Sequence, residues 1–296
     1  MDKENSARDR ALSYSKWDFL NKQQLIFLVT SLTAPFVTLL FTSCDADDTQ
    51  QITNFDQLVL QEEFDNDGAP NSAVWGFDIG TGENGWGNNE LQYYTDRTEN
   101  VTVQNGILLI TAQEESFEGS SYTSARLLTK DRFEQQYGRF EARIRLPYGQ
   151  GIWPAFWMLG ADINENPWPA AGEIDIMEYR GQNPSVLIGS VHGPGYNGGN
   201  AISKEYTLPN DRFDTGFHVF GIEWSPEKIN FYVDDVLYNQ ITPADVTGEW
   251  VFNKPFYILM NLAVGGSFVG SPNAETVFPQ TMLVDYVRVY KNTELN

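Results

Sequence analysis

The sequence predicts an all-β protein, a β-jelly-roll sandwich of two curved antiparallel sheets with a concave cleft. Long amphipathic helical patterns are missing from the 296 residues, whereas short segments that alternate apolar and polar side chains recur. Glycine, proline and asparagine separate these segments, as they do in sandwiches and jelly rolls. No internal repeat interrupts the pattern, so we expect residues 56–296 to form one domain.

The alternating segments can be followed along the chain. Residues 107–112 are expected to form a buried strand after an Asn105–Gly106 turn. Residues 138–146 alternate between apolar side chains that face inward and charged ones that face outward. Asp234–Asp235 suits a two-residue hairpin turn, because aspartate tolerates the positive φ that such turns require. Further strands are expected at 217–224, 229–233, 236–240, 256–262 and 282–290.

The amino terminus has the order of a secretory signal. Lys16 and Lys22 precede an uncharged, mostly apolar run at residues 25–41, and small residues follow it up to Cys44. Cys44 is the only cysteine, and it lies where the signal of a bacterial lipoprotein has its lipidated cysteine. A transmembrane anchor is the alternative, although the run is short for a span of about 20 residues.

We therefore interpret residues 1–44 as a lipoprotein-type signal segment and the polar, acidic residues 45–55 as a short tether. The acidic run after the cysteine resembles a surface-export tag of bacterial lipoproteins. The sequence thus predicts an exported lipoprotein of the cell envelope, in the outer membrane or exposed at the cell surface. Its lipid anchor is the only membrane contact that we expect.

Composition excludes several classes of function. The chain has 40 acidic and 19 basic residues and a net charge of −21, so it repels nucleic acids and anionic membrane surfaces. It has two histidines, no Gly-x-Ser-x-Gly motif and no cysteine in the predicted domain. Serine and cysteine hydrolase triads therefore have little support, and nothing resembles a phosphate-binding glycine loop.

Three carboxylates lie within six residues of one strand-like segment, Gly172–Tyr179. Side chains alternate faces in a strand, so Glu173 and Asp175 share one face. Simple alternation would then place Glu178 among isoleucines, where a lone carboxylate is expensive. A β-bulge at about Ile176–Met177 adds one residue, shifts the register and returns Glu178 to the acid face.

Glycoside hydrolysis is the chemistry that requires two glutamates at one bond, one as nucleophile or base and one as general acid. Asp175, between them, can hydrogen-bond the nucleophile and separate the two pKa values. Glu173 and Glu178 on a concave sheet could approach the ~5–5.5 Å of a retaining enzyme. A solvated acidic strand edge is the alternative interpretation. A metal site has less support, because no histidine lies near the cluster in the sequence.

Trp153 and Trp157 lie four residues apart, so in a strand they would share a face with Ala155 while Phe156 turns to the core. Indole rings stack on the apolar faces of sugars, although buried core tryptophans are the alternative.

His192 follows a strand-like segment at 186–191 that could lie beside the acid strand. It could donate to a substrate hydroxyl or cap Gly193. His218 starts a core-like strand and is interpreted as structural.

These residues resemble glycoside hydrolase family 16. Residues Glu173–Glu178 resemble its catalytic signature in the bulged form, which is typical of the laminarinase-like, agarase and porphyranase branches. The resemblance covers about residues 58–291 and is strongest to the laminarinase branch, whose members cleave β-1,3-glucans internally. Further matching motifs are Trp86–Gln92, Gly151–Leu159, His192–Gly193 and Met260–Gly266.

The resemblance implies that Glu173 is the nucleophile, Glu178 the acid/base and Asp175 the partner of Glu173. It also implies glucan contacts by five further residues, although turn formation or a surface salt bridge explains some of them equally well. Some members bind a structural calcium ion, for which the matching positions are Glu63, Asp285 and a carbonyl near Gly106. Catalysis itself would need no cofactor. The five implied glucan contacts are Asn88, Asn89, Glu90, Arg126 and Asn261.

The leading hypothesis is therefore a monomeric, retaining endo-β-1,3-glucanase. One alternative keeps the chemistry on another polymer: mixed-linkage β-1,3-1,4-glucan, agarose or porphyran. Sulfated polymers need cationic partners, which the acidic composition makes scarce. A non-catalytic carbohydrate-binding sandwich is a different class, and it would not need the three acids.

Overall fold

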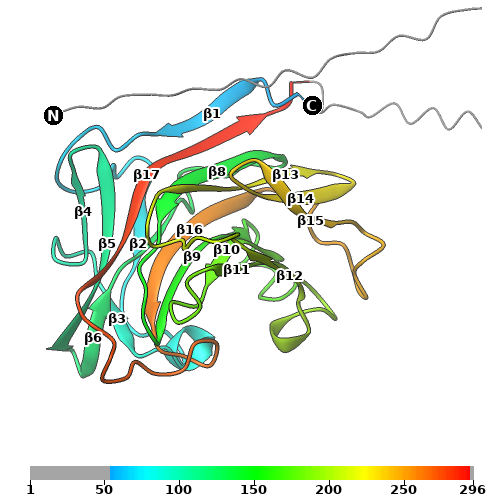
Figure 1. The fold of residues 1–296 in the computed structure, drawn as a ribbon. Coiled ribbons are helices and arrows are strands. Elements are labelled where there is room, and N and C mark those ends of the chain that lie inside the picture. The colour runs from blue at the N-terminus through cyan, green and yellow to red at the C-terminus, as the bar shows by residue number, and fades with distance from the viewer. Residues whose placement is uncertain (1–53, 294–296) are drawn as a thin grey trace, which may run out of the picture. The chain divides into compact units, whose positions relative to one another are not determined.

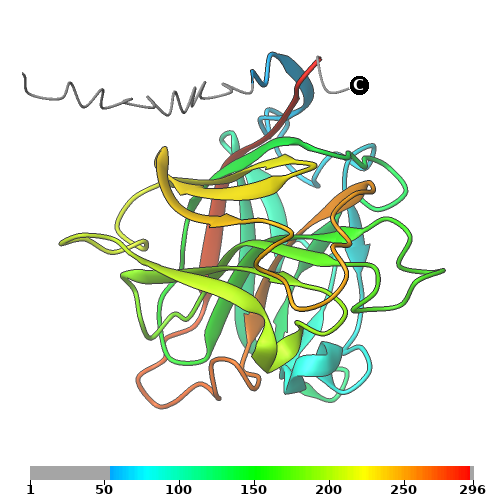
Figure 2. The same cartoon turned by 90° about the vertical axis from the view of Figure 1, so that its right-hand side faces the viewer.

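A computed structural model describes residues 54–293, which form two stacked β-sheets, seen from two sides in Figures 1 and 2. The predicted signal segment with Cys44, and the tether up to residue 53, lie outside the described residues. No helix among the described residues is long and apolar enough to cross a membrane.

The outer sheet has ten strands and follows the order β15-β14-β13-β8-β17-β5-β6-β3, with β1 paired to β17 and β4 paired to β5. Its pairs are antiparallel except for β3 with β6. The strands are β1 (Gln57–Glu62), β3 (Gln92–Tyr94), β4 (Val101–Gln104), β5 (Ile107–Phe117), β6 (Ser120–Ser124), β8 (Gly138–Arg145), β13 (His218–Ser225), β14 (Lys228–Val233), β15 (Val236–Ile241) and β17 (Gln280–Lys291).

The inner sheet has seven antiparallel strands in the order β12-β11-β10-β9-β16-β7-β2. Its strands are β2 (Gly76–Asp78), β7 (Arg126–Leu128), β9 (Ile152–Gly160), β10 (Glu173–Tyr179), β11 (Val186–His192), β12 (Ile202–Thr207) and β16 (Phe256–Val264). Two short helical turns, Gly85–Asn89 and Gly198–Asn200, stand in the connections.

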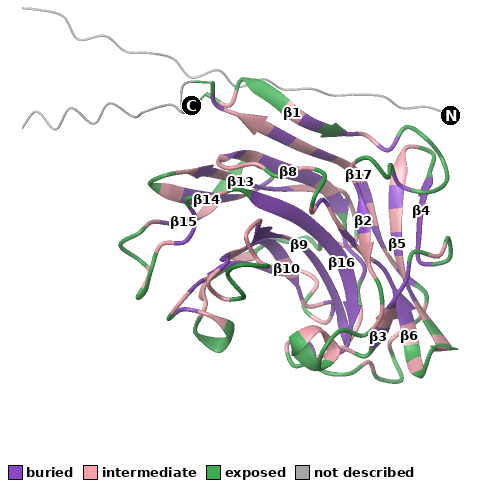
Figure 3. Cartoon of the chain, turned by 180° about the vertical axis from the view of Figure 1, so that it is seen from behind, coloured by how far each residue is buried: buried purple, intermediate pink, exposed green. Residues whose placement is uncertain are grey.

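The hydrophobic core lies between the two sheets, and Figure 3 shows the buried residues running along their strands. The inward side chains of β8 are buried as its alternation predicts: Phe140, Ala142 and Ile144 are fully buried. Every residue of β16 is buried, because this central strand packs on the outer sheet on one face and against cleft tryptophans on the other.

The predicted fold class is confirmed, and the expected strands are present with ends shifted by a few residues. The Asp234–Asp235 turn is also confirmed, with φ of 48° and 63°. The strand expected at 107–112 is longer than predicted, because β5 continues to Phe117 to pair with β6.

The predicted bulge in β10 is confirmed by the register of its two neighbours. On β11, Asp175 pairs with Ser190 but Glu178 pairs with Ile188. Ile176 and Met177 therefore stand opposite a single residue, and both side chains are buried. Both neighbouring strands record the shift, since the pairing with β9 also slips between Asp175 and Met177.

Gly172 directs the chain into β10. Its φ of +79° is a left-handed conformation, and a Cβ atom there would lie 2.8 Å from Val251 Cγ2 and 3.0 Å from Phe256 Cζ. Both the backbone and the packing therefore require glycine immediately before Glu173.

We predict that Gly172→Ala lowers the free energy of unfolding by about 2–5 kcal/mol, because left-handed backbone costs roughly 1–2 kcal/mol and overpacking roughly 1–3 kcal/mol. Urea unfolding measures this. Gly216→Ala is the matched control, since φ there is ordinary and no atom lies within 4 Å of the added Cβ. Equal stability of the two variants would contradict the requirement for glycine at 172.

Candidate active site

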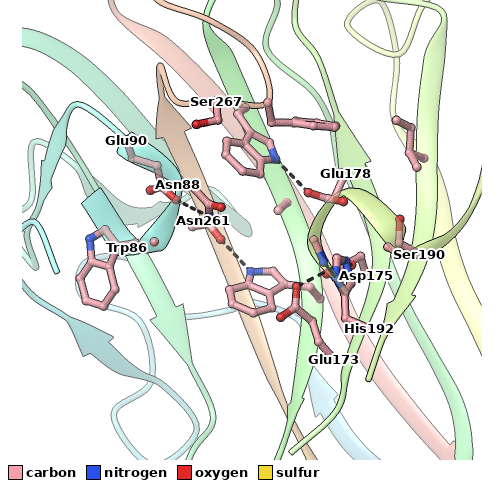
Figure 4. A pocket seen from close by; sticks show the side chains of 18 of the residues that line it. Trp86, Asn88, Glu90, Glu173, Asp175, Glu178, Ser190, His192, Asn261 and Ser267 are labelled. Carbon is pink, nitrogen blue, oxygen red and sulfur yellow. Dashed lines mark hydrogen bonds and ion pairs between the residues drawn. The ribbon is translucent and has the colours of Figure 1, made fainter. Parts of the chain in front are cut away.

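An open cleft with a volume of about 1170 Å³ lies over the seven-stranded sheet. Its floor comes from β7, β9, β10, β11, β12 and β16, and the turn at Gly85–Asn89 contributes to one wall. Figure 4 shows the three acids of β10 on one side of this cleft, with Trp86, Asn88 and Glu90 on the other. The predicted concave cleft is therefore present, and the acid strand lies within it.

All three carboxyl groups of β10 line the cleft, although little of them is exposed. The side chain of Glu173 is 18% exposed and that of Asp175 is 4% exposed. Burial, followed by the charge of Asp175, raises the pKa of Glu173 to about 8. Burial, followed by the charge of Glu173, raises the pKa of Glu178 to about 7. The pKa of Asp175 also lies well above its usual value, because of burial first and then Glu178.

Three raised pKa values mean that the group holds protons at neutral pH instead of three negative charges. Glu178 keeps a proton up to about pH 7, as a general acid must. The charge of Asp175 favours a proton on Glu173, so the protonation states of these two carboxyl groups depend on each other. When Glu173 loses its proton, its carboxylate can act as a nucleophile.

Each glutamate accepts a hydrogen bond from one indole N–H group. Trp153 Nε1 donates to Glu178 Oε1 at 3.2 Å, and Trp168 Nε1 donates to Glu173 Oε2 at 2.7 Å. An indole N–H can only donate, so each bond fixes one carboxyl oxygen as an acceptor. For Glu178, the transferable proton is therefore on the other oxygen, Oε2.

The predicted parity of β9 is confirmed. Trp153, Ala155 and Trp157 line the cleft, whereas Phe156 is fully buried in the core. Trp157 Nε1 also donates to Asn261 Oδ1 at 2.8 Å, which holds the ring and the amide together on the cleft floor.

His192 on β11 lies beside the acid strand, as predicted, and lines the cleft, but it does not cap Gly193, whose N–H donates to the Tyr196 carbonyl. The Gly198 N–H donates to Nδ1 at 3.1 Å, so this nitrogen carries no proton and the proton of the neutral ring is on Nε2. Nε2 lies 3.0 Å from Asp175 Oδ2 and 3.9 Å from Glu173 Oε1. His192 therefore faces the carboxylate pair with an N–H group.

Glu173, Asp175 and His192 also bring three metal-ligating atoms within 4.8 Å of one another. The nitrogen that faces the two carboxylates is the protonated one, and a metal ligand must be deprotonated. The close approach of His192 Nε2 to the two carboxylates therefore accounts for the group without a metal ion.

The opposite wall is built around Glu90. Its carboxylate accepts hydrogen bonds from Gln92 Nε2 at 2.7 Å, Tyr94 Oη at 3.1 Å and Asn88 Nδ2 at 3.3 Å. Burial raises the pKa of Glu90, and these donors lower it. Asn88 and Glu90 line the cleft, as expected of glucan contacts.

Asn89 does not line the cleft, in contrast to Asn88 and Glu90. Its side chain donates to Ser267 Oγ at 2.9 Å and so ties the turn to the loop after β16. The motif around it did not reveal this, because Ser267 is distant in the sequence.

Arg126 lines the cleft between two tryptophan rings. Its guanidinium carbon lies 4.7 Å from the Trp86 ring centre and 4.8 Å from that of Trp157. Its Nε lies 3.0 Å from Asp78 Oδ2. The alternative that the sequence left open, a salt bridge, is thus present, on an arginine that also lines the cleft.

The predicted calcium ligands are engaged by arginines. Arg288 donates to both oxygens of Glu63 at 2.7 and 2.9 Å, and Arg143 donates to Asp285 Oδ2 at 2.6 Å. Gly106, with φ of +77°, forms the turn between β4 and β5. Calcium binding at these residues stays a prediction.

The family model "Glycosyl hydrolases family 16" matches residues 88–288, more than half of the chain. The chain belongs to glycosyl hydrolases family 16. It is 45% identical over 250 residues to the "Beta-glucanase" of Rhodothermus marinus, covering 80% of this chain and 86% of that protein.

Solved structures agree with this membership of family 16. The laminarinase catalytic domain from Thermotoga maritima MSB8 is 47% identical with a TM-score of 0.76, over 80% of this chain and 98% of that chain. The endo-β-1,3-glucanase from Pyrococcus furiosus is 48% identical with a TM-score of 0.76, over 79% and 94% respectively. The glycosidase class predicted from the acid strand is therefore confirmed.

The sequence did not predict several residues that line the cleft, among them Trp168, Arg180 and Phe268. Arg180 could have been found, because it shares the strand parity of Glu178 two residues earlier. Phe268 comes from the loop after β16, and the Arg180 guanidinium lies 4.1 Å from its ring centre. Trp168 lies in a loop with no periodic signal.

We predict that deleting Met177 yields a folded protein with hydrolytic activity lowered on the order of 100-fold, because an ångström of misplacement of Glu178 can cost that much. Kinetics on laminarin and thermal unfolding measure the two quantities. Met177→Leu keeps the residue count and approximate volume and should lose little of either. A deletion variant with parental activity would show that the bulge does not set the position of Glu178.

Proposed function

We propose that this family 16 protein is a retaining endo-β-1,3-glucanase that acts on laminarin-type polysaccharide. The observation that carries the proposal is the bulge of β10, which places Glu173, Asp175 and Glu178 on one face inside the cleft. The two glutamates also have different neighbours, since Trp168 donates to Glu173, whereas Trp153 donates to Glu178 and the charge of Arg180 lowers the pKa of Glu178. Related proteins of known structure support the substrate, since two of them are named for β-1,3-glucan or laminarin hydrolysis.

In the first half-reaction, the Glu173 carboxylate attacks the anomeric carbon and forms a glycosyl ester. Glu178 gives its proton to the departing glycosidic oxygen. The positive charge that develops on the sugar favours the proton being on Asp175 and the negative charge on Glu173. Glu173 is therefore in its ionised, nucleophilic form as the transition state is reached.

In the second half-reaction, ionised Glu178 takes a proton from water, and the water oxygen attacks the anomeric carbon. The ester bond to Glu173 breaks and returns its electron pair to the carboxylate. Two inversions at the same carbon retain the β configuration. The neutral donor Trp153 suits both half-reactions, because its N–H bonds the carbonyl oxygen of the acid as well as the carboxylate.

The open cleft and its aromatic floor favour an internal position on a long chain over a closed pocket for one sugar. Trp153 and Trp157 present indole faces that can stack on glucosyl rings, and Asn88 and Asn261 offer polar groups beside them. We assign substrate contact to these residues within this proposal.

Other polymers fit less well. Both arginines that line the cleft have partners, since Arg126 lies beside Asp78 and Arg180 stacks on Phe268 with Nη1 4.0 Å from Glu205. A sulfated polymer would need unpaired cations. A non-catalytic binder would have no use for three acids held largely out of water, where charge opposes folding.

We also propose export as a lipoprotein, anchored through Cys44 after removal of residues 1–43 and held by a tether that ends near residue 55. The support is the basic, apolar and small-residue order of the amino terminus with its sole cysteine. An outer-membrane or cell-surface position would bring the cleft to large polysaccharides.

In this proposal, catalysis needs no cofactor, and a single chain forms the whole active site. Calcium at Glu63, Asp285 and the Gly106 carbonyl is a separate prediction, and it would require the ion to displace Arg288 and Arg143 from the two carboxylates. The expectation of a monomer also stands as a prediction.

A product assay on laminarin, lichenan, agarose and porphyran tests the substrate. We expect oligosaccharides of several lengths from laminarin, weaker or no release from lichenan, and none from the other two. Glu173→Gln is the control and should abolish most turnover while it leaves the thermal unfolding transition intact. Faster release from agarose or porphyran would refute the proposed substrate, and near-normal activity of Glu173→Gln would refute the nucleophile.

We predict that Glu178→Ala still forms the glycosyl-enzyme from a substrate whose leaving group needs no protonation. Its turnover should be slow, and azide should restore it by replacing the activated water as a β-glycosyl azide forms. Product analysis by NMR identifies the azide adduct. An α-configured adduct, or no rescue, would contradict the role of Glu178.

We predict that the native protein begins at a lipidated Cys44. Mass spectrometry of protein purified from membranes of the producing cell measures the amino-terminal fragment, and Cys44→Ala should appear as soluble, unlipidated protein. An intact Met1 on the native protein, or an unlipidated start downstream of residue 44, would show the anchoring proposal to be wrong.

A further inference from the structure

The donor to the nucleophile comes from a loop, whereas the donor to the acid comes from the sheet. Trp153 is buried on β9, but Trp168 is 45% exposed in the connection between β9 and β10. Its Nε1 nevertheless reaches Glu173 Oε2 at 2.7 Å. Trp168 is less buried than Trp153. Burial of its ring alone therefore does not explain why its N–H is aimed at Glu173.

Several polar contacts hold this connection in place. Lys254 Nζ donates to Asp162 Oδ2 at 2.7 Å and to the Ala170 carbonyl at 3.1 Å. Asn166 Nδ2 also donates to Asp162 Oδ2, at 2.7 Å. The two ends of the connection are thus fixed on both sides of Trp168, so its indole is directed at Glu173 by the surrounding structure.

The charged and titratable groups around Glu173 are mostly acids. Asp175 and Glu178 come from its own strand, and β11 contributes His192 with Nε2 at 3.9 Å. The charge of Arg180 lowers the pKa of Glu178, and its Nη1 lies 4.0 Å from Glu205 Oε1 of β12. On β9, the residues paired with Glu173 and Asp175 are Leu159 and Trp157, which carry no charge.

A donor-only group at 2.7 Å stabilises the anionic form of a carboxyl group more than its protonated form. We propose that Trp168 is a positioning residue for the nucleophile: its indole N–H orients the Glu173 carboxylate and favours its ionised form. The inference rests on the proposed role of Glu173 as the nucleophile. It assigns a function to the N–H group of Trp168 that is separate from any stacking of its ring on sugar.

Two substitutions separate these functions. Trp168→Phe keeps an aromatic face and removes the N–H, whereas Trp168→Ala removes both. One limb of kcat/KM against pH reports the ionisation of the nucleophile in the free enzyme, and it is the limb whose apparent pKa matches that of Glu173. We expect both variants to move this limb upward by about 0.5–1 pH unit, which lowers kcat/KM about 3- to 10-fold on its acidic side. Only Trp168→Ala should also raise KM severalfold.

Trp250→Phe is the matched control. Its Nε1 has no hydrogen-bond partner among the described residues, and the ring lies outside the cleft against Phe252. The same limb of its profile should coincide with that of the unsubstituted protein. The proposal would be overturned if Trp168→Phe left the apparent pKa of the limb unchanged while Trp168→Ala increased KM. Trp168 would then contribute only a stacking surface.

A measurement on the unsubstituted protein covers the case in which the variants fail to fold. One indole N–H resonance should titrate with the same apparent pKa as the limb assigned to Glu173, and it should stop titrating in Glu173→Gln. Absence of such a resonance would overturn the proposal. A Glu173→Gln variant that remained active would instead refute the nucleophile assignment, so the two failures can be told apart.

Discussion

One extra residue in β10 sets the geometry on which the site depends. With Ile176 and Met177 opposite a single position of β11, Glu178 returns to the face of Glu173. That position is Gly189, where a Cβ would lie 2.3 Å from Tyr238 Oη and 2.7 Å from Phe231 Cδ1 of the outer sheet. The bulge therefore has a counterpart in the neighbouring strand, and the close packing of the two sheets opposes a slip of register.

The cleft balances its acids with neutral donors and few cations. Trp153, Trp168 and the N–H of His192 face the three carboxyls, and none of them brings a permanent positive charge. Arg180 is the cation whose charge acts on Glu178, but burial outweighs it and keeps the pKa of Glu178 raised. Neutral donors orient both glutamates and still allow Glu178 to alternate between its protonated and ionised forms during the two half-reactions.

Local sequence predicted those parts of the site that one strand determines. The period of two, together with the cost of burying Glu178 among isoleucines, indicated the bulge, and the same period placed Trp153 and Trp157 in the cleft. Contacts between distant segments left no such signal. Asn89 donates to Ser267 and does not line the cleft, where the sequence placed it. Trp168 reaches Glu173 from an irregular loop, and the sequence did not predict it as a site residue.

Arg126 shows why residue type alone does not define a sugar contact. Its charge is matched by Asp78, and its guanidinium lies close to the rings of Trp86 and Trp157, each a cation–π contact worth about 0.5–2 kcal/mol. The arginine thus joins a ring of the wall to a ring of the floor. Because its charge is already neutralised, this side of the cleft suits an uncharged polymer, and the spacing of its two tryptophans becomes a fixed feature against which glucosyl rings can stack.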